Sequence, residues 1–302
     1  MIGNSVTGKT LGIIGMGRIG RMAAKCAKAF GMKVIAWSRN LKQQDCQKVD
    51  VEYVNSMDLF KMSDIFILIP SRIGSTRLEN KPLQNIEGKS LIQRVFENAL
   101  SITSNVYVAT DSNKIKDNLS NVTNNIIMTS SEHISGTDRI YEASTKLNLK
   151  DSDLIINLQG DEPFLPKDAV MKMINDYKKN DCDVITLSSD IHSKNDLLDE
   201  NCVKVQINED SYANDFYRIS DKKNLKKHIG IYGYTLKVLR KIVNFDPSER
   251  ELTNKLEQLR FLDHGLNIYV SYYDKNIPHG IDTQEDLINA RKHFKDAIKR
   301  KP

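Results

Sequence analysis

Apolar and polar positions near the start of the chain follow first a strand pattern, then a helical one, then a strand pattern again. Apolar runs predict strands over residues 10–15 and 33–37, and apolar residues at helical spacing predict a helix over 18–30. The inward face of that helix is expected to carry Ile19, Met22, Ala23 and Ala27. These three elements predict a strand–helix–strand unit.

A second alternation of strand and helix patterns begins near residue 63. Buried strands are predicted over 64–70, 105–110 and 153–158, and a helix is predicted over 89–100. The apolar side chains that this helix should turn inward are Leu91, Ile92, Val95, Phe96 and Ala99. Strands that alternate with helices are typical of an open α/β sheet.

Composition and length favour a globular protein of one large domain plus a fragment, or of two domains. The 302 residues are 40% hydrophobic and 27% charged, and Gly 15 with Pro 7 excludes fibrous or linker-dominated proteins. No apolar run approaches the roughly 20 residues of a membrane span, and the N-terminus lacks the pattern of a signal peptide. We therefore expect a cytoplasmic protein without a membrane partner.

The charge balance points to a small anionic substrate rather than to nucleic acid. Lys+Arg 44 against Asp+Glu 39 gives a net charge of +5, dispersed along the chain. The one basic cluster is expected on the solvated face of the closing helix, at Lys292, Lys295, Lys299, Arg300 and Lys301. The cysteines form no metal-ligand spacing and are expected to be reduced and structural: Cys26, Cys46, Cys182 and Cys202.

The turn after the first strand carries a complete G-x-G-x-x-G motif at Gly15, Gly17 and Gly20. Between a strand and a helix, this motif lets backbone amides and the helix N-terminus face a pyrophosphate. The second strand ends in Trp-Ser-Arg-Asn over 37–40, without the carboxylate that would hold a ribose, so the pattern favours a 2′-phosphate.

This stretch, from Thr7 to Asp64, resembles the nucleotide-binding domain of D-isomer-specific 2-hydroxyacid dehydrogenases, of which it covers about the first half. Nothing after residue 64 continues that family's pattern or supplies its catalytic Arg, Glu and His. We therefore expect residues 1–61 to be a vestigial half-Rossmann segment and residues 62–302 to be the working domain. An NAD(P)-binding oxidoreductase fragment is the alternative.

A loop that follows the strand over 64–70 carries Arg72, Arg77 and Lys81 among small and hydroxyl residues. Forked guanidinium donors and an ammonium at the carboxyl end of a strand suit a triphosphate, although a surface loop could hold three cations by chance. Two further loops, at Thr110-Asp111 and over 135–139, suit a base or ribose, but by composition either could be an ordinary turn or a helix N-cap.

Two acidic residues far apart in the sequence are candidates for one metal site. Asp161 follows the strand over 153–158 and a glycine, which suits Mg²⁺, but the same residues also make a good turn. Thr283 and Asp286 are explained as a capping pair for the last helix. Asp282 does not cap, and we hypothesise that it meets Asp161 across a cleft.

Residues 63–302 resemble the 3-deoxy-manno-octulosonate (Kdo) cytidylyltransferases along essentially their whole length. The departure at Asn80, where the family usually has Gly, is compatible with a left-handed backbone. The runs that carry the resemblance are Ile-Pro-Ser-Arg over 69–72 through Lys-Pro-Leu over 81–83, Val-Ala-Thr-Asp over 108–111, Ser-Gly-Thr-Asp-Arg over 135–139, Asn-Leu-Gln-Gly-Asp-Glu-Pro over 157–163, Lys-His-Ile-Gly-Ile-Tyr-Gly-Tyr over 227–234, Leu-Glu-Gln-Leu-Arg over 256–260 and Gly-Ile-Asp-Thr over 280–283.

The resemblance implies a Rossmann-like mixed α/β sheet of the nucleotide-diphospho-sugar transferase type, commonly a homodimer, that converts CTP and Kdo to CMP-Kdo and pyrophosphate with Mg²⁺. An acylneuraminate-like acid is the alternative sugar. Asp161 and Asp282 are then the metal ligands, and they are catalytic together with Arg72 and Lys81. The nucleotide is assigned to Arg72, Arg77, Lys81, Thr110, Asp111 and Asp138. The sugar acid is assigned to Gln159, Arg218, Glu257, Gln258 and His228, of which His228 could equally be a satisfied core histidine.

Overall fold

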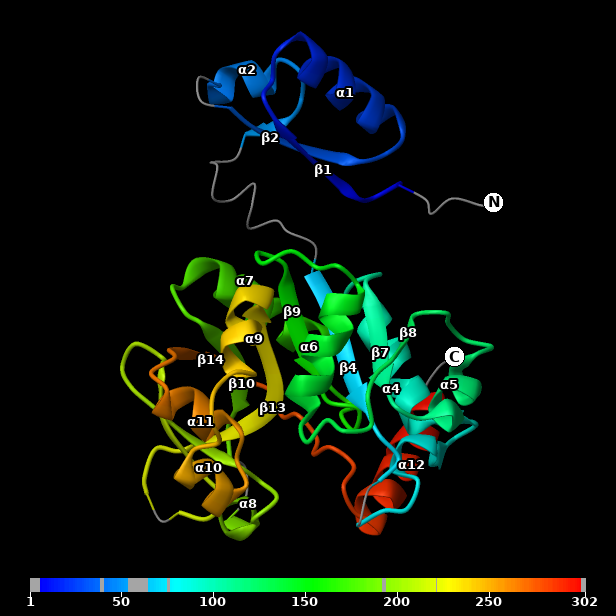
Figure 1. Ribbon diagram of the computed structural model, residues 1–302, viewed down its shortest axis with the longest axis vertical. Helices are drawn as coiled ribbons and strands as arrows, with labels where there is room; N and C mark the ends of the chain where they lie inside the picture. The colour runs from blue at the N-terminus through cyan, green and yellow to red at the C-terminus, as the bar shows by residue number, and fades with distance from the viewer. Residues whose placement is uncertain are drawn as a thin grey trace. The chain divides into compact units, whose positions relative to one another are not determined.

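The chain forms two compact units, Met1–Ser63 and Asp64–Pro302. The computed structural model describes residues 6–38, 41–53, 65–74, 77–191, 194–220 and 222–299, and of these the side chains at positions 14, 37, 194, 195 and 297–299 are not described. Three predicted features therefore lie wholly or partly outside the described residues. They are the stretch over 37–40, the boundary at 61–62, and positions 300–301 of the basic cluster. Figure 1 traces the elements of each unit.

The first unit contains the predicted strand–helix–strand arrangement. Its described strands pair in parallel in the order β1-β2-β3, with Thr10 opposite Lys33 in the first pair. The elements are β1 (Thr10–Ile14), α1 (Arg18–Ala29), β2 (Lys33–Trp37), α2 (Gln43–Gln47) and β3 (Glu52–Tyr53). A small core of its own, which includes Ile13, Val34 and Cys46, holds the unit together.

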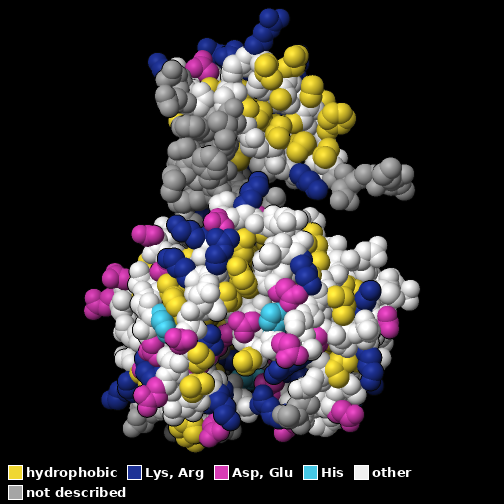
Figure 2. All heavy atoms as spheres, in the orientation of Figure 1, with side chains coloured by type: hydrophobic (Ala, Val, Ile, Leu, Met, Phe, Trp, Pro, Cys, Tyr) yellow, Lys and Arg dark blue, Asp and Glu magenta, His cyan; other side chains and the backbone are white. Residues whose placement is uncertain are grey.

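The face that helix α1 turns inward differs from the predicted one. Of the predicted set only Ala27 is buried, whereas Ile19 is 82% exposed and Met22 62% exposed. A Cβ atom on Gly20 would lie 2.1 Å from the carbonyl oxygen of Gly15, so the helix packs too closely on the turn for a larger residue there. The small residues Gly20, Ala24 and Ala27 therefore face the sheet, and hydrophobic side chains gather on the outer surface of this unit (Figure 2).

The second unit is built on a mixed sheet, as predicted. In the described residues the sheet has nine strands, seven of them in the order β12-β11-β13-β9-β4-β7-β8, with β10 paired to β13 and β14 paired to β10. The central strands β9, β4, β7 and β8 are parallel, and β13 is antiparallel to β9. The strands are β4 (Ile65–Ser71), β7 (Val106–Thr110), β8 (Ile126–Met128), β9 (Leu154–Leu158), β10 (Val184–Ser189), β11 (Lys204–Ile207), β12 (Ala213–Tyr217), β13 (Lys226–Thr235) and β14 (Ile268–Tyr272).

The helices of this unit cover both faces of the sheet. The predicted helix over 89–100 begins two residues later, because the Ser90 hydroxyl accepts the Gln93 N–H and caps it. The helical elements are η1 (Lys81–Leu83), α4 (Leu91–Leu100), α5 (Asn113–Leu119), α6 (Gly136–Lys146), α7 (Lys167–Lys179), α8 (Lys194–Leu198), α9 (Leu236–Ile242), α10 (Glu249–Asn254), α11 (Gln258–Asp263) and α12 (Gln284–Lys299). A short hairpin of β5 (Asn85–Ile86) and β6 (Lys89–Ser90) precedes α4.

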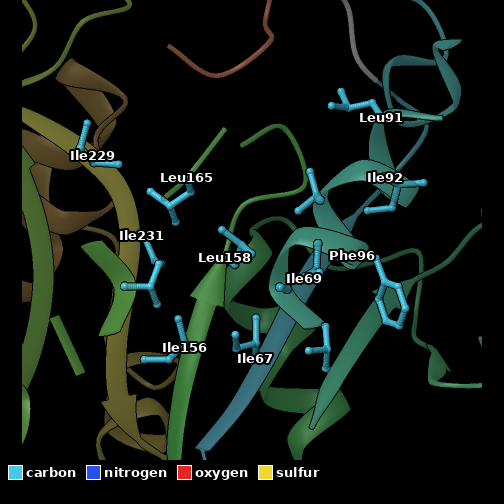
Figure 3. Close-up of a cluster of buried hydrophobic side chains, with 14 of the residues drawn as sticks. Ile67, Ile69, Leu91, Ile92, Phe96, Ile156, Leu158, Leu165, Ile229 and Ile231 are labelled. Carbon is cyan, nitrogen blue, oxygen red and sulfur yellow. The ribbon is translucent and has the colours of Figure 1, made fainter. Parts of the chain in front are cut away.

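Alternate side chains of the central strands pack into two separate hydrophobic cores, one on each face of the sheet. Ile67 and Ile69 belong to the core under α4, α7 and α12, whereas Leu68 belongs to the core under α6, α9 and α11. Figure 3 shows part of the first core, to which Leu91, Ile92 and Phe96 of α4 and the inward residues of the strands belong. All five side chains predicted to face inward on α4 are buried, which confirms that prediction.

Three further expectations concern the lysines of the last helix, the cysteines and membrane spans. Lys292 and Lys295 are exposed on α12, and the four cysteines are free thiols, as predicted. None of the described helices is long and apolar enough to cross a bilayer.

Candidate active site

The strands of the second unit end at one edge of the sheet, and the predicted polar loops follow them. Because β4, β7 and β9 are parallel, the loops after Ser71, Thr110 and Leu158 leave the sheet on the same side. Strand β13 runs antiparallel to β9, with Ile231 opposite Leu158, so its first residues reach the same edge.

Two cavities open at this edge and meet at three shared residues. One has a volume of about 400 Å³ and is lined by the loop after β4 and by the segment before α6. The other has a volume of about 580 Å³ and is lined by the start of β13 and by the residues around α11. The side chains common to both linings are Gln159, Asp161 and Asp282.

Lys81 joins the two acidic residues that the sequence pairs only as a hypothesis. Its Nζ atom donates to Oδ2 of Asp161 at 2.6 Å and to Oδ1 of Asp282 at 2.7 Å. Both carboxylates therefore lie within reach of one cation. Burial alone would lower the pKa of Lys81, but the two carboxylates outweigh it and raise that pKa. Burial would raise the pKa of Asp282, but Lys81, with further help from the arginines, lowers it.

The two arginines of the same loop also lie at the smaller cavity. Arg72 is exposed on its lining. Arg77 lies 3.3 Å from Oδ1 of Asp282 and donates to Oδ1 of Asn201 at 2.8 Å. Asn80 adopts the left-handed backbone that the sequence allows, with φ 48°, immediately before Lys81. The loop thus brings Lys81 and Arg77 to the carboxylates and places Arg72 on the wall of the same cavity.

Two local features hold Asp161 and Asp282 in place. A Cβ atom on Gly160 would lie 3.0 Å from the carbonyl oxygen of Pro70, so glycine lets the turn after β9 approach the end of β4. The N–H of Ile281 donates to the carbonyl of Asp161 at 2.9 Å and ties the two acidic segments together.

The predicted capping pair of the last helix is present. Thr283 and Asp286 exchange hydrogen bonds, since the Thr283 N–H donates to Oδ2 of Asp286 at 2.8 Å and the Asp286 N–H donates to the Thr283 hydroxyl at 3.2 Å. Asp282 takes no part in this cap through its side chain, which is free to face Lys81.

Three of the residues assigned to the nucleotide have structural partners and do not line either cavity. The Thr110 hydroxyl accepts the Ser112 N–H at 3.2 Å, and Asp111 pairs with Arg139 at 2.9 Å. Asp138 completes a capping box with Ser135 at the start of α6, which confirms the helix-cap alternative for that loop.

The residues assigned to the sugar line the larger cavity. Gln258 is buried, and Oε2 of Glu257 accepts the Thr137 hydroxyl at 2.9 Å. Burial lowers the pKa of His228 to about 3, and its Nε2 lies 2.9 Å from the Thr186 hydroxyl, so the imidazole is neutral near pH 7. His228 is therefore both a satisfied buried histidine and a residue of the cavity wall.

Arg218 lines the same cavity, but its guanidinium is engaged by the backbone. Its Nε, Nη1 and Nη2 atoms donate to the carbonyls of Asn254, Glu200 and Lys255 at 2.7, 2.9 and 2.8 Å. The side chain thus holds two loops of the cavity wall together. Sequence reasoning could not foresee this, because backbone carbonyls carry no residue signature.

Glu162 and Lys227 are ionisable residues of the larger cavity that were not predicted from the sequence. Burial, reinforced by Asp161, raises the pKa of Glu162 to about 8, and its buried Oε2 has no hydrogen-bond partner among the described residues. Lys227 is 5% exposed, and its Nζ donates to the carbonyl of Ile277 at 2.9 Å. The only sequence signal for them was their place beside Asp161 and His228.

The donor set fits a divalent cation held with few protein ligands. Among the described residues no cluster of three or more His, Cys, Asp or Glu side chains could hold a metal ion. The two carboxylates that share the Lys81 ammonium offer hard oxygen ligands to one cation, which is the arrangement that Mg²⁺ uses when phosphates and water complete its shell.

The chain matches known proteins in both of its units. The family model for cytidylyltransferases matches residues 66–269. A 3-deoxy-manno-octulosonate cytidylyltransferase of Francisella tularensis subsp. novicida is 39% identical over 251 residues, which cover 77% of this chain and 99% of that protein. The chain belongs to the 3-deoxy-manno-octulosonate cytidylyltransferase family. A member of this family from Thermodesulfovibrio yellowstonii is 41% identical over 74% of the chain and 96% of its own length.

Solved structures agree with this family assignment. CMP:2-keto-3-deoxy-manno-octonic acid synthetase complexed with CTP superposes with a TM-score of 0.71 and 34% identity, over 78% of this chain and 100% of that one. The N-terminal segment of this family member, residues 1–78, matches the NAD-binding domain of D-isomer specific 2-hydroxyacid dehydrogenases. The mixed α/β fold predicted from the resemblance is confirmed.

Proposed function

We propose that this chain transfers the cytidylyl group of CTP to the anomeric hydroxyl of Kdo and releases pyrophosphate, a step of lipopolysaccharide biosynthesis. The observation that carries the proposal is the meeting of two cavities at Asp161 and Asp282, the smaller of which is lined by three cationic side chains. One cavity then holds the triphosphate and the other the sugar acid. The family membership of residues 66–269 supports the same reaction.

Asp161 and Asp282 are the residues that hold Mg²⁺ in this proposal. The bound ion supplies charge neutralisation at the reacting phosphate and lowers the pKa of a hydroxyl in its shell. The lowered pKa of Asp282 keeps that carboxylate ionised and ready to bind a cation. Lys81 bonds to both carboxylates and holds them close enough together that one ion could bind both.

The cationic loop positions the nucleotide and neutralises the leaving pyrophosphate. Arg72, Arg77 and Lys81 converge on the smaller cavity, so each can donate to phosphate oxygens in the manner of an electrostatic clamp. The Lys81 ammonium lines the same cavity, and with a divalent ion on the two carboxylates it would be available to donate to a phosphate oxygen. The chain thereby brings two anionic substrates together, which is the main obstacle to this reaction.

Gln159, Glu257, Gln258 and His228 surround the second substrate. Because the imidazole of His228 is neutral, we assign it to hydrogen bonding with a sugar hydroxyl and not to proton transfer. Arg218 shapes the cavity wall through the carbonyls that it binds. Asp111 and Asp138 hold Arg139 and Ser135, which line the nucleotide cavity, and Thr110 fixes the turn after β7 through Ser112.

Pyrophosphate release from each of the four nucleoside triphosphates, with and without Kdo and Mg²⁺, tests the proposal. We expect release only with CTP, Kdo and the metal together. Release with N-acetylneuraminate in place of Kdo would favour the nine-carbon acid, and no release with either acid would overturn the proposal. We also propose that the chain forms a homodimer. Light scattering coupled to size-exclusion chromatography should then give twice the mass of one chain.

For the first unit we propose a vestigial, fused role without cofactor binding. The match to a dehydrogenase domain covers 78 residues, and its glycines Gly15 and Gly20 are explained by backbone conformation and close packing alone. NADPH fluorescence should stay unchanged when the full chain is added. A saturable change would revive the NAD(P)-binding alternative.

A further inference from the structure

The start of strand β13 forms one wall of the larger cavity. Ile231 lies opposite Leu158, the last residue of β9, so residues 226–230 extend beyond the end of that strand. Lys227, His228, Ile229 and Gly230 line the cavity. The wall is therefore built from backbone that the sheet itself fixes.

Two successive lysines at this point have opposite surroundings. Side chains of neighbouring strand residues point to opposite faces of a sheet. Lys226 pairs with Asp190 at 2.7 Å, lies over the ring of Tyr272 and lines neither cavity. Lys227 lines the larger cavity and is buried, so of these two lysines it is the one placed to contact a molecule bound there.

The ammonium group of Lys227 is only partly compensated. Of its three donors, one is used by the carbonyl of Ile277, and the described residues offer no carboxylate within ion-pair distance. Burial lowers its pKa, against the opposing effects of Cys202, Glu162, Asp196 and Asp199. An ammonium buried without an anionic partner is costly, and an anion that enters the cavity removes that cost.

The other basic side chains of the cavity are less suited to an anion. The guanidinium of Arg218 already donates to three backbone carbonyls. Lys255 is exposed to solvent. Burial and Lys227 lower the pKa of His279, which lies 3.7 Å from Asp196, and His228 is neutral. Lys227 is thus a buried cation of this lining whose ammonium still has N–H donors available to a ligand.

Building on the proposed function, we propose that Lys227 binds the carboxylate of the sugar acid and makes this cavity selective for an acidic sugar. The contact places the carboxylate at the β13 wall, on the side of the cavity formed by Pro278 and the residues that follow it. The ammonium then has the carbonyl and the carboxylate as acceptors, which completes its hydrogen bonding. The role is one of substrate binding, because Lys227 touches none of the metal-holding carboxylates.

Steady-state kinetics with Kdo and with its uncharged C1 methyl ester test this contact. For Lys227→Met we expect the KM for Kdo to rise on the order of 30-fold or more, the scale of losing one partner of a buried charge pair, while the KM for CTP is unchanged. The wild-type protein should prefer the acid strongly, whereas Lys227→Met should treat acid and ester alike. Lys227→Arg should restore most of the preference, and Lys226→Met is the matched control that should behave as wild type.

The outcomes separate this inference from the proposed function. If wild-type protein turns over Kdo and folded Lys227→Met keeps the preference for the acid over the ester, the carboxylate contact is wrong and the proposed function stands. Equal losses with both substrates mean that Lys227 only anchors the Ile277 segment, which also overturns the contact. If the wild-type protein neither binds Kdo by calorimetry nor turns it over, both proposals fall.

Discussion

The Nζ atom of Lys81 lies 2.7 Å from Oδ1 of Asp282, although the two residues are 201 positions apart in the sequence. The same nitrogen also holds Asp161. A lysine from the loop after β4 thus keeps in place two acids from the turn after β9 and the segment before α12. This arrangement neutralises an acidic pair that would otherwise repel itself, and it leaves the pair ready for a stronger cation.

The first prediction concerns this shared ammonium. Lys81→Met should raise the KM for CTP by on the order of 10²-fold, the scale of losing one charged contact to a phosphate. It should also move the acidic limb of the pH–rate profile to higher pH, because Lys81 is the main influence that lowers the pKa of Asp282. Initial rates over a pH series at varied CTP measure both effects.

Lys89→Met is the matched control, since Lys89 pairs with Glu97 at 2.6 Å and lines neither cavity. An unchanged KM for CTP in folded Lys81→Met would make Lys81 a structural clamp only. An unmoved acidic limb would show that a different group controls it.

The second prediction concerns Asp161. Asp161→Asn should lower kcat by roughly 10²- to 10⁴-fold with little change in folding, because the amide keeps the shape but loses the charge that holds the metal. Direct Mn²⁺ titration followed by electron paramagnetic resonance should show weaker binding. Asp168→Asn, which alters a surface carboxylate paired with Lys275, should change neither measurement. Near-wild-type turnover by Asp161→Asn would remove this residue from the mechanism.

Much of the site could be predicted because it rests on elements with strong local patterns. Buried apolar runs fixed the positions of β4, β7 and β9, and the loops at their ends then had to share one edge. The helix α4 followed from five apolar positions at helical spacing. The resemblance then supplied the pairing of Asp161 with Asp282, which physical reasoning alone left as a guess.

What could not be predicted depends on backbone acceptors and on tight packing. The carbonyls that engage Arg218 belong to loops with no recognisable pattern. The burial of Lys227 depends on how far β13 extends past β9, which the sequence of one strand does not reveal. The prediction of the buried face of α1 was wrong. Close packing at Gly20 outweighed the preference of large apolar side chains for the interior.

The third prediction concerns the N-terminal unit. Removing residues 1–61 should leave the kcat and both KM values of CMP-Kdo formation unchanged. The second unit has its own two cores, and every residue that lines the cavities belongs to it. Kinetics of the shortened chain beside the full chain provide the measurement. Lost activity in a shortened chain with a native circular dichroism spectrum would make the first unit a working part.

The fourth prediction concerns Glu162 and the pH dependence of stability. Its pKa is raised from 4.5 to about 8 in the folded protein, so between these values the folded state binds more protons than the unfolded state. Stability should therefore fall as pH rises from about 5 to about 8, with a contribution of at most about 1.4 kcal/mol per pH unit from this group. Glu162→Gln stays neutral at every pH and should lack this contribution.

Urea unfolding at pH 5 and pH 8, with chelator present, should show Glu162→Gln becoming more stable relative to wild type only at the higher pH. Glu209→Gln, at an exposed turn, should show no such gain. A constant difference between Glu162→Gln and wild type across this range would mean that Glu162 is already ionised in the folded protein, and the unpartnered Oε2 would then need a cation beside it.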